Sequence, residues 1–398
     1  MPNAPTAIMP TYGRLPVTFA RGEGAILYDT ADRAYLDGLS GIAVTNLGHN
    51  HARVTAAVTE QAARLVHTSN LFHIGLQEEA ADLLRQATGM ENMFFCNSGA
   101  EANEAAIKLA RRLGHHRAIE RPHIIVLDGA FHGRTIGALS ATGNSKIREG
   151  FGPLLDGFLH VPANNLSAIH ALGDALADVV AVLVEPIQGE GGVRPLDIDY
   201  LQGLRDLCSQ NQWLLMFDEV QTGNGRCGST YVCEQLEIKP DVMLTAKGLG
   251  NGLPIGVCMA RGEAAQLLGP GDHGSTYGGN PLCCAAAVAV LTTLSEDNVM
   301  QRATTVRDVL LSALHQALSD PALVTEVRGR GLMIGIQPSV ATKEIVQRGL
   351  DRGLLINIAG GDTIRVLPPL VMTDEQAGEL GAGIAHIIND IAARENTL

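Results

Sequence analysis

Short apolar segments alternate with helical stretches through the middle of this chain. Five of them have the length and composition of β-strands: Met93–Cys96, His123–Leu127, Val179–Val184, Trp213–Phe217 and Val242–Thr245. Strands that alternate with helices form a mostly parallel sheet with helices on both faces. The sequence therefore predicts an α/β fold built on a large, mostly parallel sheet.

Charged residues stand at or just after the ends of the last four segments, namely Asp128, Glu185, Asp218 and Lys247. In open α/β sheets, ligands lie outside the carboxyl ends of the strands, so these side chains are expected to line one crevice. A charged residue at a strand end more often begins a solvated loop, and Asp128 alone indicates nothing more.

The chain changes character beyond about Pro281. A long helix is expected over Cys284–Ser295, and short strands around Val324–Val327, Leu332–Ile336 and Ile364–Leu367. We expect three parts: residues 1–50 as an N-terminal segment packing on the small domain or across a subunit interface, 51–283 as the large domain, and 284–398 as a smaller α+β domain.

Charge and composition limit the kinds of partner that this chain can bind. The net charge of −13 would repel nucleic acid and anionic lipid, which leaves a small molecule as the expected partner. The longest apolar runs are too short to span a bilayer, and no secretory signal is evident, so we expect a cytoplasmic protein. The seven cysteines lack the C-x-x-C spacing of a zinc site, which indicates buried thiols and no metal.

Lys247 is one of only five lysines, and it lies between a strand and the glycine-rich turn Gly248–Gly252. Burial there would lower its pKa and free the amine to attack an aldehyde. Lys108, by contrast, lies on a predicted helix four residues after Glu104, as in an ordinary surface pair. A strand-end lysine taken alone is still more often structural.

Asp218 strengthens the case for Lys247 because it ends a strand 29 positions earlier, about one βα unit. A carboxylate beside a pyridine nitrogen keeps that nitrogen protonated, which makes the ring a better electron sink. The alternative is a solvated acidic loop, but the apolar and amide residues of 220–223 that follow suit solvent poorly.

Ser98 begins a third segment, in which a turn of small residues leads into a strong helix. Its hydroxyl suits an N-cap, and the free N–H groups and the helix dipole would attract a phosphate. This signal is weak alone because most domains contain a capped helix. Other signatures are absent from the sequence: it has no P-loop, no G-x-G-x-x-G after a strand, no H-E-x-x-H and no G-x-S-x-G.

Several long segments together resemble the class III aminotransferases, of the ornithine and acetylornithine type, which have the type I pyridoxal-phosphate (PLP) transferase fold. They are SGAEANEAAIKLAR from Ser98, FHGRT from Phe131, EPIQGEGG from Glu185, FDEVQTGNGR from Phe217, DVMLTAKGLGNGLPIG from Asp241 and HGSTYGGNPL from His273. The resemblance runs over nearly the whole chain in the same order. One departure is Asn251, which interrupts the glycine run after the lysine.

The resemblance implies that pyridoxal 5'-phosphate is the cofactor, with Lys247 holding it as a Schiff base and Asp218 pairing with its ring nitrogen. It implies that Phe131 and Val220 cover the two ring faces and that Gln221 lies near the ring hydroxyl. The cofactor-binding set implied is Ser98, Gly99, Ala100, Phe131, His132, Glu185, Asp218, Val220, Gln221, Lys247 and Thr276. Thr276 would reach the phosphate of a neighbouring subunit, which implies a homodimer with shared active sites.

Substrate carboxylates would be gripped by Arg134 and Arg365, because a guanidinium fork binds a carboxylate at two points. The alternative for Arg134 is a surface ion pair of little value. In the family, the residue matching Glu190 can neutralise the arginine matching Arg365 when an ω-amine must react. Tyr12 would lie near the substrate.

The expected reaction is a ping-pong transfer from N-acetylornithine to 2-oxoglutarate, in arginine biosynthesis, with Lys247 as general base and acid. Ile42 supports an acylated donor, because ornithine aminotransferases generally carry tyrosine there, although its segment could equally be plain core. N-Succinylornithine, ornithine and 4-aminobutyrate remain alternative donors. A PLP-dependent aminomutase and a cofactor-binding regulatory protein are more distant alternatives.

Overall fold

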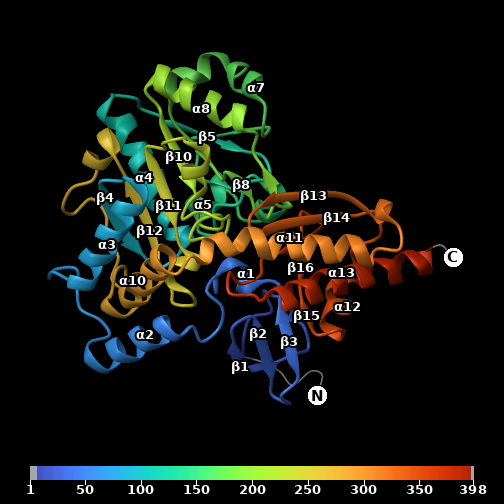
Figure 1. The fold of residues 1–398 in the computed structure, drawn as a ribbon. Coiled ribbons are helices and arrows are strands. Elements are labelled where there is room, and N and C mark those ends of the chain that lie inside the picture. The colour runs from blue at the N-terminus through green and yellow to red at the C-terminus, as the bar shows by residue number, and fades with distance from the viewer. Residues whose placement is uncertain (1–6, 396–398) are drawn as a thin grey trace.

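A seven-stranded sheet is the largest element of the computed structural model, which describes residues 7–395 (Figure 1). Its strands run in the order β4 (Asn92–Cys96), β12 (Gly256–Ala260), β11 (Val242–Thr245), β10 (Leu214–Asp218), β7 (Val179–Val184), β5 (His123–Leu127) and β6 (Phe158–Val161). β12 alone runs antiparallel to the other six strands. The predicted large, mostly parallel sheet is confirmed.

The sequence missed two of these strands. It predicted β5, β7 and β11 with their observed bounds and placed β4 and β10 within one residue. β6 has only four residues and contains His160, and β12 begins with Gly256, two residues after Pro254. β6 is too short to give a clear strand signal, and glycine and proline disfavour a strand at the start of β12, so both strands depend on pairing within the sheet.

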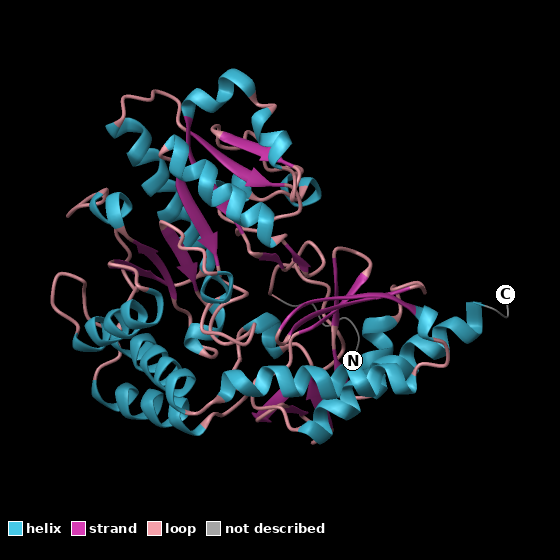
Figure 2. Cartoon of the chain, turned by 45° about the horizontal axis from the view of Figure 1, so that its top comes forward, coloured by secondary structure: helices cyan, strands magenta, loops and turns pink. Residues whose placement is uncertain are grey.

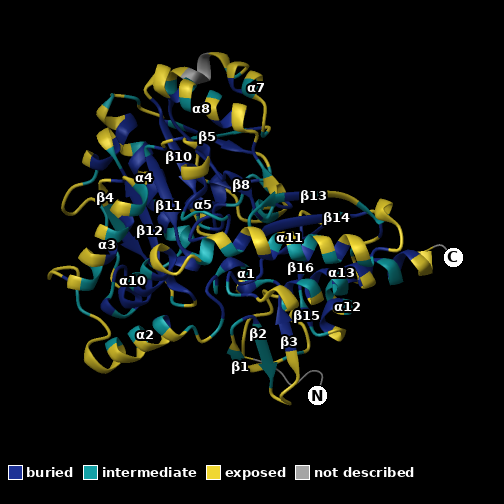
Figure 3. Ribbon diagram, in the orientation of Figure 1, coloured by how far each residue is buried: buried dark blue, intermediate teal, exposed yellow. Residues whose placement is uncertain are grey.

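Both faces of the sheet are buried, which explains its continuous apolar strands. Along β5, Ile124 and Val126 pack on one face in a cluster that includes α4 (Gly99–His116), whereas Ile125 and Leu127 pack on the other with α8 (Ile198–Asn211). Figure 3 shows the buried strands beneath helices whose outer surfaces are exposed. Each large apolar side chain buried here contributes roughly 1.5–3 kcal/mol.

Further helices lie between residues 52 and 296, and Figure 2 shows helices on both sides of the strands of the large sheet. They are α2 (Ala52–Arg64), α3 (Gly75–Thr88), α5 (Ile136–Ala141), α6 (Ser145–Arg148), α7 (Leu166–His170), α9 (Val232–Leu236) and α10 (Pro281–Glu296), with short 3-10 turns η1 (Gly173–Asp178), η2 (Lys247–Gly250) and η3 (Gly262–Gln266). α10 begins three residues before the expected Cys284, because Asn280 caps it by accepting a hydrogen bond from Cys283 N at 2.9 Å. Its side chains enter the apolar clusters of both the large and the C-terminal sheets.

A smaller antiparallel sheet follows in the C-terminal part. Its order is β13 (Val324–Arg330), β14 (Met333–Pro338), β17 (Thr363–Val366) and β16 (Asn357–Ala359). The 3-10 turn η4 (Pro321–Leu323) precedes it, and α11 (Val299–Ala317), α12 (Ile345–Asp351) and α13 (Asp374–Glu395) supply buried residues to the same core. The expected α+β character of this part is present.

The N-terminal strands β1 (Phe19–Glu23), β2 (Ile26–Asp29) and β3 (Ala34–Asp37) form a sheet with β15 (Leu354–Leu355). Leu36 of β3 pairs with Leu354 of the C-terminal part. We keep the division into 1–50, 51–283 and 284–398 as a proposal that this pairing supports. Within residues 7–395 no single helix meets the length and hydropathy of a membrane span; α10 and α11, bent by 72°, meet them only as a pair.

Candidate active site

A cavity of about 430 Å³ opens at the carboxyl ends of the central strands. Its walls bring together eleven of the residues predicted for the site: Ser98, Gly99, Ala100, Phe131, His132, Arg134, Glu185, Asp218, Val220, Gln221 and Lys247. It is also lined by residues that the sequence did not single out, among them Val44, Asn97 and Asn103. The predicted crevice therefore exists, although Asp128 is exposed and does not line it.

Asp218 is held in place by three hydrogen bonds. Its Oδ2 lies 2.8 Å from His132 Nδ1 and accepts from Asn103 Nδ2 at 2.8 Å, while Oδ1 accepts from Val220 N at 3.1 Å. The carboxylate is buried, so these donors offset the cost of taking its charge out of water. Sequence reasoning missed Asn103, whose signal was a single amide on the otherwise apolar face of α4.

The cavity walls fit a phosphorylated pyridine cofactor. Two buried polar atoms beside Asp218, His132 Nε2 and Asn103 Oδ1, have no hydrogen-bond partner among the described residues. Gly99 lies so close to Val220 that an added Cβ would stand 2.7 Å from Val220 Cγ1. The turn therefore has room only for a residue without a side chain, as close approach of a ligand to the backbone requires.

The turn before α4 is a capped helix start. Ser98 Oγ accepts from Glu101 N at 3.2 Å, and the Glu101 carboxylate accepts from Asn97 N at 2.9 Å and from Asn97 Nδ2 at 2.8 Å. These bonds order the turn at the positive end of an 18-residue helix. An anionic group at this end of the cavity would meet free backbone N–H groups and a favourable dipole.

Lys247 begins η2 with a φ of 45°, a left-handed backbone conformation that residues other than glycine rarely adopt. Burial lowers the pKa of its amine, whereas the nearby Glu190 acts in the opposite direction. Asn251 anchors the loop, because its side chain accepts from Leu47 N at 2.9 Å and donates to Gly48 O at 3.1 Å. The departure from the family's glycine run therefore has a structural role.

Glu185 connects two walls of the cavity. Its Oε2 accepts from Phe131 N at 2.8 Å and its Oε1 from Gly189 N at 3.3 Å. Burial raises the pKa of this carboxyl to about 7, and His132 opposes that rise. Phe131, predicted to stack on a ring, is thus fixed by a group at the end of the neighbouring strand β7.

Arg365 and Glu190 form an ion pair beside this cavity. Arg365 Nη1 lies 2.5 Å from Glu190 Oε1 and 3.3 Å from Gln221 Oε1, and its Nε donates to Asn357 Oδ1 at 3.2 Å. The guanidinium is almost fully buried. Although burial favours the neutral acid, Arg365 holds the pKa of Glu190 below its usual value. Glu190 therefore occupies the guanidinium that was predicted to bind a substrate carboxylate.

Four predicted residues lie farther out or at the rim. Arg134 is an exposed wall residue whose Cζ lies 5.8 Å from the Phe131 ring centroid. Tyr12 and Thr276 are exposed and do not line the cavity. Ile42 packs against the core in α1 (Ser40–Ala43), a turn whose residues all have positive φ, and Val44 lines the cavity instead.

The predicted pair of Lys108 and Glu104 does not form. Lys108 Nζ lies 3.0 Å from His273 Nδ1, and the Glu104 carboxylate accepts from Ala138 N at 3.1 Å and from Thr135 Oγ1 at 2.5 Å. Residues brought close by the fold outcompete the neighbour on the helix. No group of three or more metal-ligating side chains lies together within residues 7–395.

Similarity to known proteins extends over nearly the whole chain. The family described as aminotransferase class-III matches residues 8–388. Acetylornithine aminotransferase 1 of Bordetella pertussis is 46% identical over 390 residues, covering 98% of this chain and 99% of the relative. Acetylornithine aminotransferase of Nitrosomonas europaea is 47% identical over 381 residues, covering 96% and 97%.

Solved structures agree with the fold. The ornithine aminotransferase of Toxoplasma gondii superposes with a TM-score of 0.92 at 33% identity, over 98% of this chain and 94% of that one. N-Acetylornithine aminotransferase of Stenotrophomonas maltophilia gives a TM-score of 0.84 at 34% identity, over 96% and 98%. The fold is thus that of the PLP-dependent transaminases, and PLP is the cofactor. This chain belongs to the class III aminotransferases.

Proposed function

We propose that this aminotransferase moves the δ-amino group of N-acetylornithine to 2-oxoglutarate, giving N-acetylglutamate semialdehyde and glutamate, as a reversible step of arginine biosynthesis. The ion pair of Arg365 and Glu190 beside Lys247 carries the proposal. A donor that presents an ω-amine needs a neutral surface, whereas 2-oxoglutarate needs a free guanidinium for its carboxylate. The names of relatives about 46% identical to this chain support the acylated donor.

Each wall of the cavity has a part in holding the cofactor. The turn of Ser98, Gly99 and Ala100 would bind its phosphate. Asp218, fixed by His132 and Asn103, would accept a hydrogen bond from the ring nitrogen and keep it protonated. PLP, when bound, supplies the electron sink that stabilises a carbanion at the substrate carbon.

The side chains around the ring would confine and orient it. Phe131 and Val220 face the cavity and would cover the two ring faces, and Gln221 would approach the ring hydroxyl. His132 and Glu185 support these groups through Asp218 and through the Phe131 backbone.

Lys247 moves the proton in this mechanism. Its neutral amine would take a proton from the substrate carbon, and the ammonium so formed would then give that proton up as general acid. Burial favours the neutral form because it lowers the pKa of Lys247. Lys247 lines the cavity, so an incoming donor amine would reach it through the cavity opening.

The two carboxylate sites would act in turn. Arg134 at the rim would bind a carboxylate of either substrate with its planar fork. Glu190 would stay on Arg365 while the donor reacts and swing away when 2-oxoglutarate arrives. Ile42 and Tyr12 would shape the donor end. Val44 stands closer to the cavity than Ile42, and it is the better candidate for contact with an acyl group.

We also propose a homodimer with shared active sites. Leu71, Phe72 and Tyr277 are large apolar side chains with exposed fractions of 87%, 66% and 63%. Asn70 ties their two segments together by donating to Ser275 O at 3.1 Å and to Gly278 O at 2.9 Å, so the exposed side chains of 71, 72 and 277 belong to one surface that includes Thr276. An apolar surface of this kind favours association. Light scattering after size-exclusion chromatography should give twice the mass of one chain.

The cytoplasmic location expected from the sequence stays a prediction.

One assay tests the reaction. Purified enzyme and 2-oxoglutarate are mixed with N-acetylornithine, N-succinylornithine, ornithine or 4-aminobutyrate, and glutamate formation is followed. The highest kcat/KM is expected with N-acetylornithine. No turnover with any donor would refute the transaminase assignment, and a preference for free ornithine would refute the acylated donor. Amine migration that does not depend on 2-oxoglutarate would indicate an aminomutase.

A further inference from the structure

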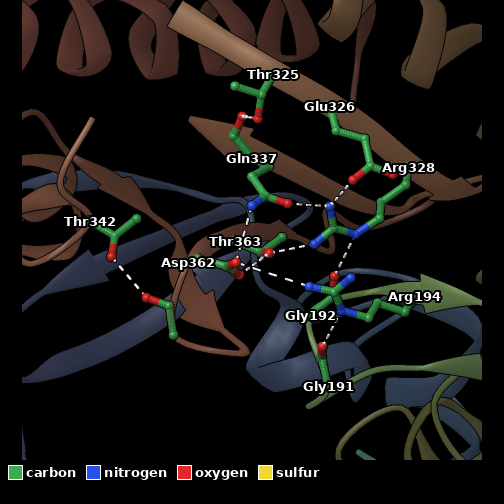
Figure 4. Close-up of polar contacts among 11 residues, drawn as sticks. Gly191, Gly192, Arg194, Thr325, Glu326, Arg328, Gln337, Thr342, Asp362 and Thr363 are labelled. Carbon is green, nitrogen blue, oxygen red and sulfur yellow. Dashed lines mark hydrogen bonds and ion pairs between the residues drawn. The ribbon is translucent and has the colours of Figure 1, made fainter. Parts of the chain in front are cut away.

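A buried arginine lies behind the ion pair of Glu190 and Arg365. Glu190 lies in the loop between β8 (Ile187–Gln188) and β9 (Arg194–Pro195), whereas Arg365 lies on β17 of the C-terminal sheet. Arg328 of β13 stands where this loop meets the sheet (Figure 4). Its side chain is 7% exposed, so its charge is held by specific partners rather than by water.

Arg328 bridges the two backbone segments that carry the pair. Its Nε donates to Gly192 O at 2.9 Å, two residues after Glu190, and its Nη2 donates to Thr363 Oγ1 at 2.6 Å, two residues before Arg365. Figure 4 shows the guanidinium pointing between these two segments. A single planar group therefore fixes the spacing between them.

The opposite side of the guanidinium is also engaged. Nη1 donates to Gln337 Oε1 at 2.7 Å and to Glu326 Oε2 at 2.6 Å. Gln337 in turn donates to Asp362 Oδ2 at 3.1 Å. Four of the five N–H donors of a guanidinium are thus used within the protein, which leaves little capacity for a ligand and indicates a positioning role.

The loop that Arg328 holds would not keep its shape alone. Val193 is buried with a φ of 51°, a strained conformation for a β-branched residue. Gly360 of the C-terminal part donates from N to Glu190 O at 3.0 Å, and an added Cβ there would lie 3.0 Å from Gly191 O. Strain of this kind persists only where surrounding contacts enforce it.

We propose that Arg328 is a positioning residue that fixes the Gly191–Gly192 backbone against β17 and thereby keeps Glu190 on Arg365. This rests on the proposed function, in which a dicarboxylate displaces Glu190 from that guanidinium. Arg328 would then set how readily the enzyme takes 2-oxoglutarate relative to the amino donor. Weakening its contacts would free Arg365 for a larger fraction of the time and so tighten apparent dicarboxylate binding.

Calorimetry with glutarate, a dicarboxylate without a keto group to react, measures this on the holoenzyme without turnover. Arg328→Lys keeps the charge but replaces the planar fork by a point donor. We expect the Kd of glutarate to fall by about three- to tenfold, the size of a typical coupling between neighbouring side chains. The KM for 2-oxoglutarate should fall with it, while kcat/KM for the amino donor declines. The matched control is Arg352→Lys, whose exposed guanidinium pairs with Asp390 away from this loop.

A double-mutant cycle separates positioning from general damage. In a Glu190→Gln background, Arg328→Lys should leave the glutarate Kd unchanged, because the competitor for Arg365 is already neutral. An unchanged Kd in the single variant, or an equal shift in both backgrounds, would overturn the proposal. If Arg328→Lys does not fold, Thr363→Val removes one contact and should shift the Kd about twofold in the same direction; no shift would again overturn it. Glutarate binding needs no turnover, so it tests the positioning role of Arg328 separately from the reaction. A failure of the proposed reaction would appear instead as no turnover with any of the four donors.

Discussion

The two ends of the active site are built in different ways. At the cofactor end, Glu185, Asp218 and Lys247 follow neighbouring strands of one sheet, so the regular spacing of the sheet brings them together. The other end is the ion pair of Glu190 and Arg365, which we call the gate. Here Glu190 comes from a strained loop and Arg365 from a different sheet. The cofactor end therefore holds its charges in fixed positions, whereas the ion pair of Glu190 and Arg365 can either be formed or be broken.

This difference predicts that changes at the cofactor end abolish chemistry, whereas changes at the gate redistribute preference between the two substrates. Lys247→Ala should reduce kcat by at least about 10⁴-fold, because one side chain supplies both the covalent attachment and the proton transfer. Glutamate formation gives the rate. Intact mass after borohydride reduction of the holoenzyme should show no added cofactor mass. Lys239→Ala, an exposed lysine one strand away, is the control and should retain both.

Asp218→Asn tests whether the charge at the cofactor end matters beyond its shape. The amide can keep one hydrogen-bonding geometry but cannot hold a proton on the ring nitrogen, so kcat should fall by about 10²–10³-fold. The KM values for both substrates should change little, because Asp218 contacts neither. Asp128→Asn, at the end of β5 but outside the cavity, should behave as wild type. A similar loss of kcat in both variants would show that the position of Asp218 in the cavity is not what makes it important.

The sequence predicted the cofactor end better than the gate for the same structural reason. Strand-end position and spacing alone placed Asp218 and Lys247 on one crevice. Nothing local paired Glu190 with Arg365, because 175 positions separate them and only the resemblance joined them. Asn103 and Arg328 were missed since each is defined by what folding brings against it. The sequence also could not show which residue of one segment faces the cavity: Ile42 and Val44 lie two positions apart, and the left-handed turn places Val44 in the cavity wall.

Glu185 touches both ends, since it bonds Phe131 N in the cofactor wall and Gly189 N in the gate loop. Its pKa is raised to about 7 by burial, above the value of about 4.3 for an unfolded chain. Between these values the folded protein retains a proton that the unfolded chain releases. The free energy of unfolding therefore falls as pH rises toward 7.

Glu185→Gln should remove that decline. Urea unfolding from about pH 5 to about pH 8 should show wild type losing on the order of 1–3 kcal/mol more than the variant. Asp128→Asn again serves as control and should follow wild type. Parallel wild-type and Glu185→Gln curves would contradict the raised pKa and leave Glu185 as a simple hydrogen-bond acceptor.

Glu190→Gln has the smallest expected effect and distinguishes the two ends most directly. A neutral amide can still accept a hydrogen bond from Arg365, but it no longer cancels the guanidinium charge. The KM for 2-oxoglutarate should then fall about fivefold to tenfold, and kcat/KM for N-acetylornithine should fall by a similar factor, since the uncancelled charge repels the ammonium of the donor. The kcat of the overall reaction should change less than the KM for 2-oxoglutarate or the kcat/KM for N-acetylornithine. Equal losses for donor and acceptor would instead place Glu190 with the cofactor end, as part of one rigid site rather than a gate.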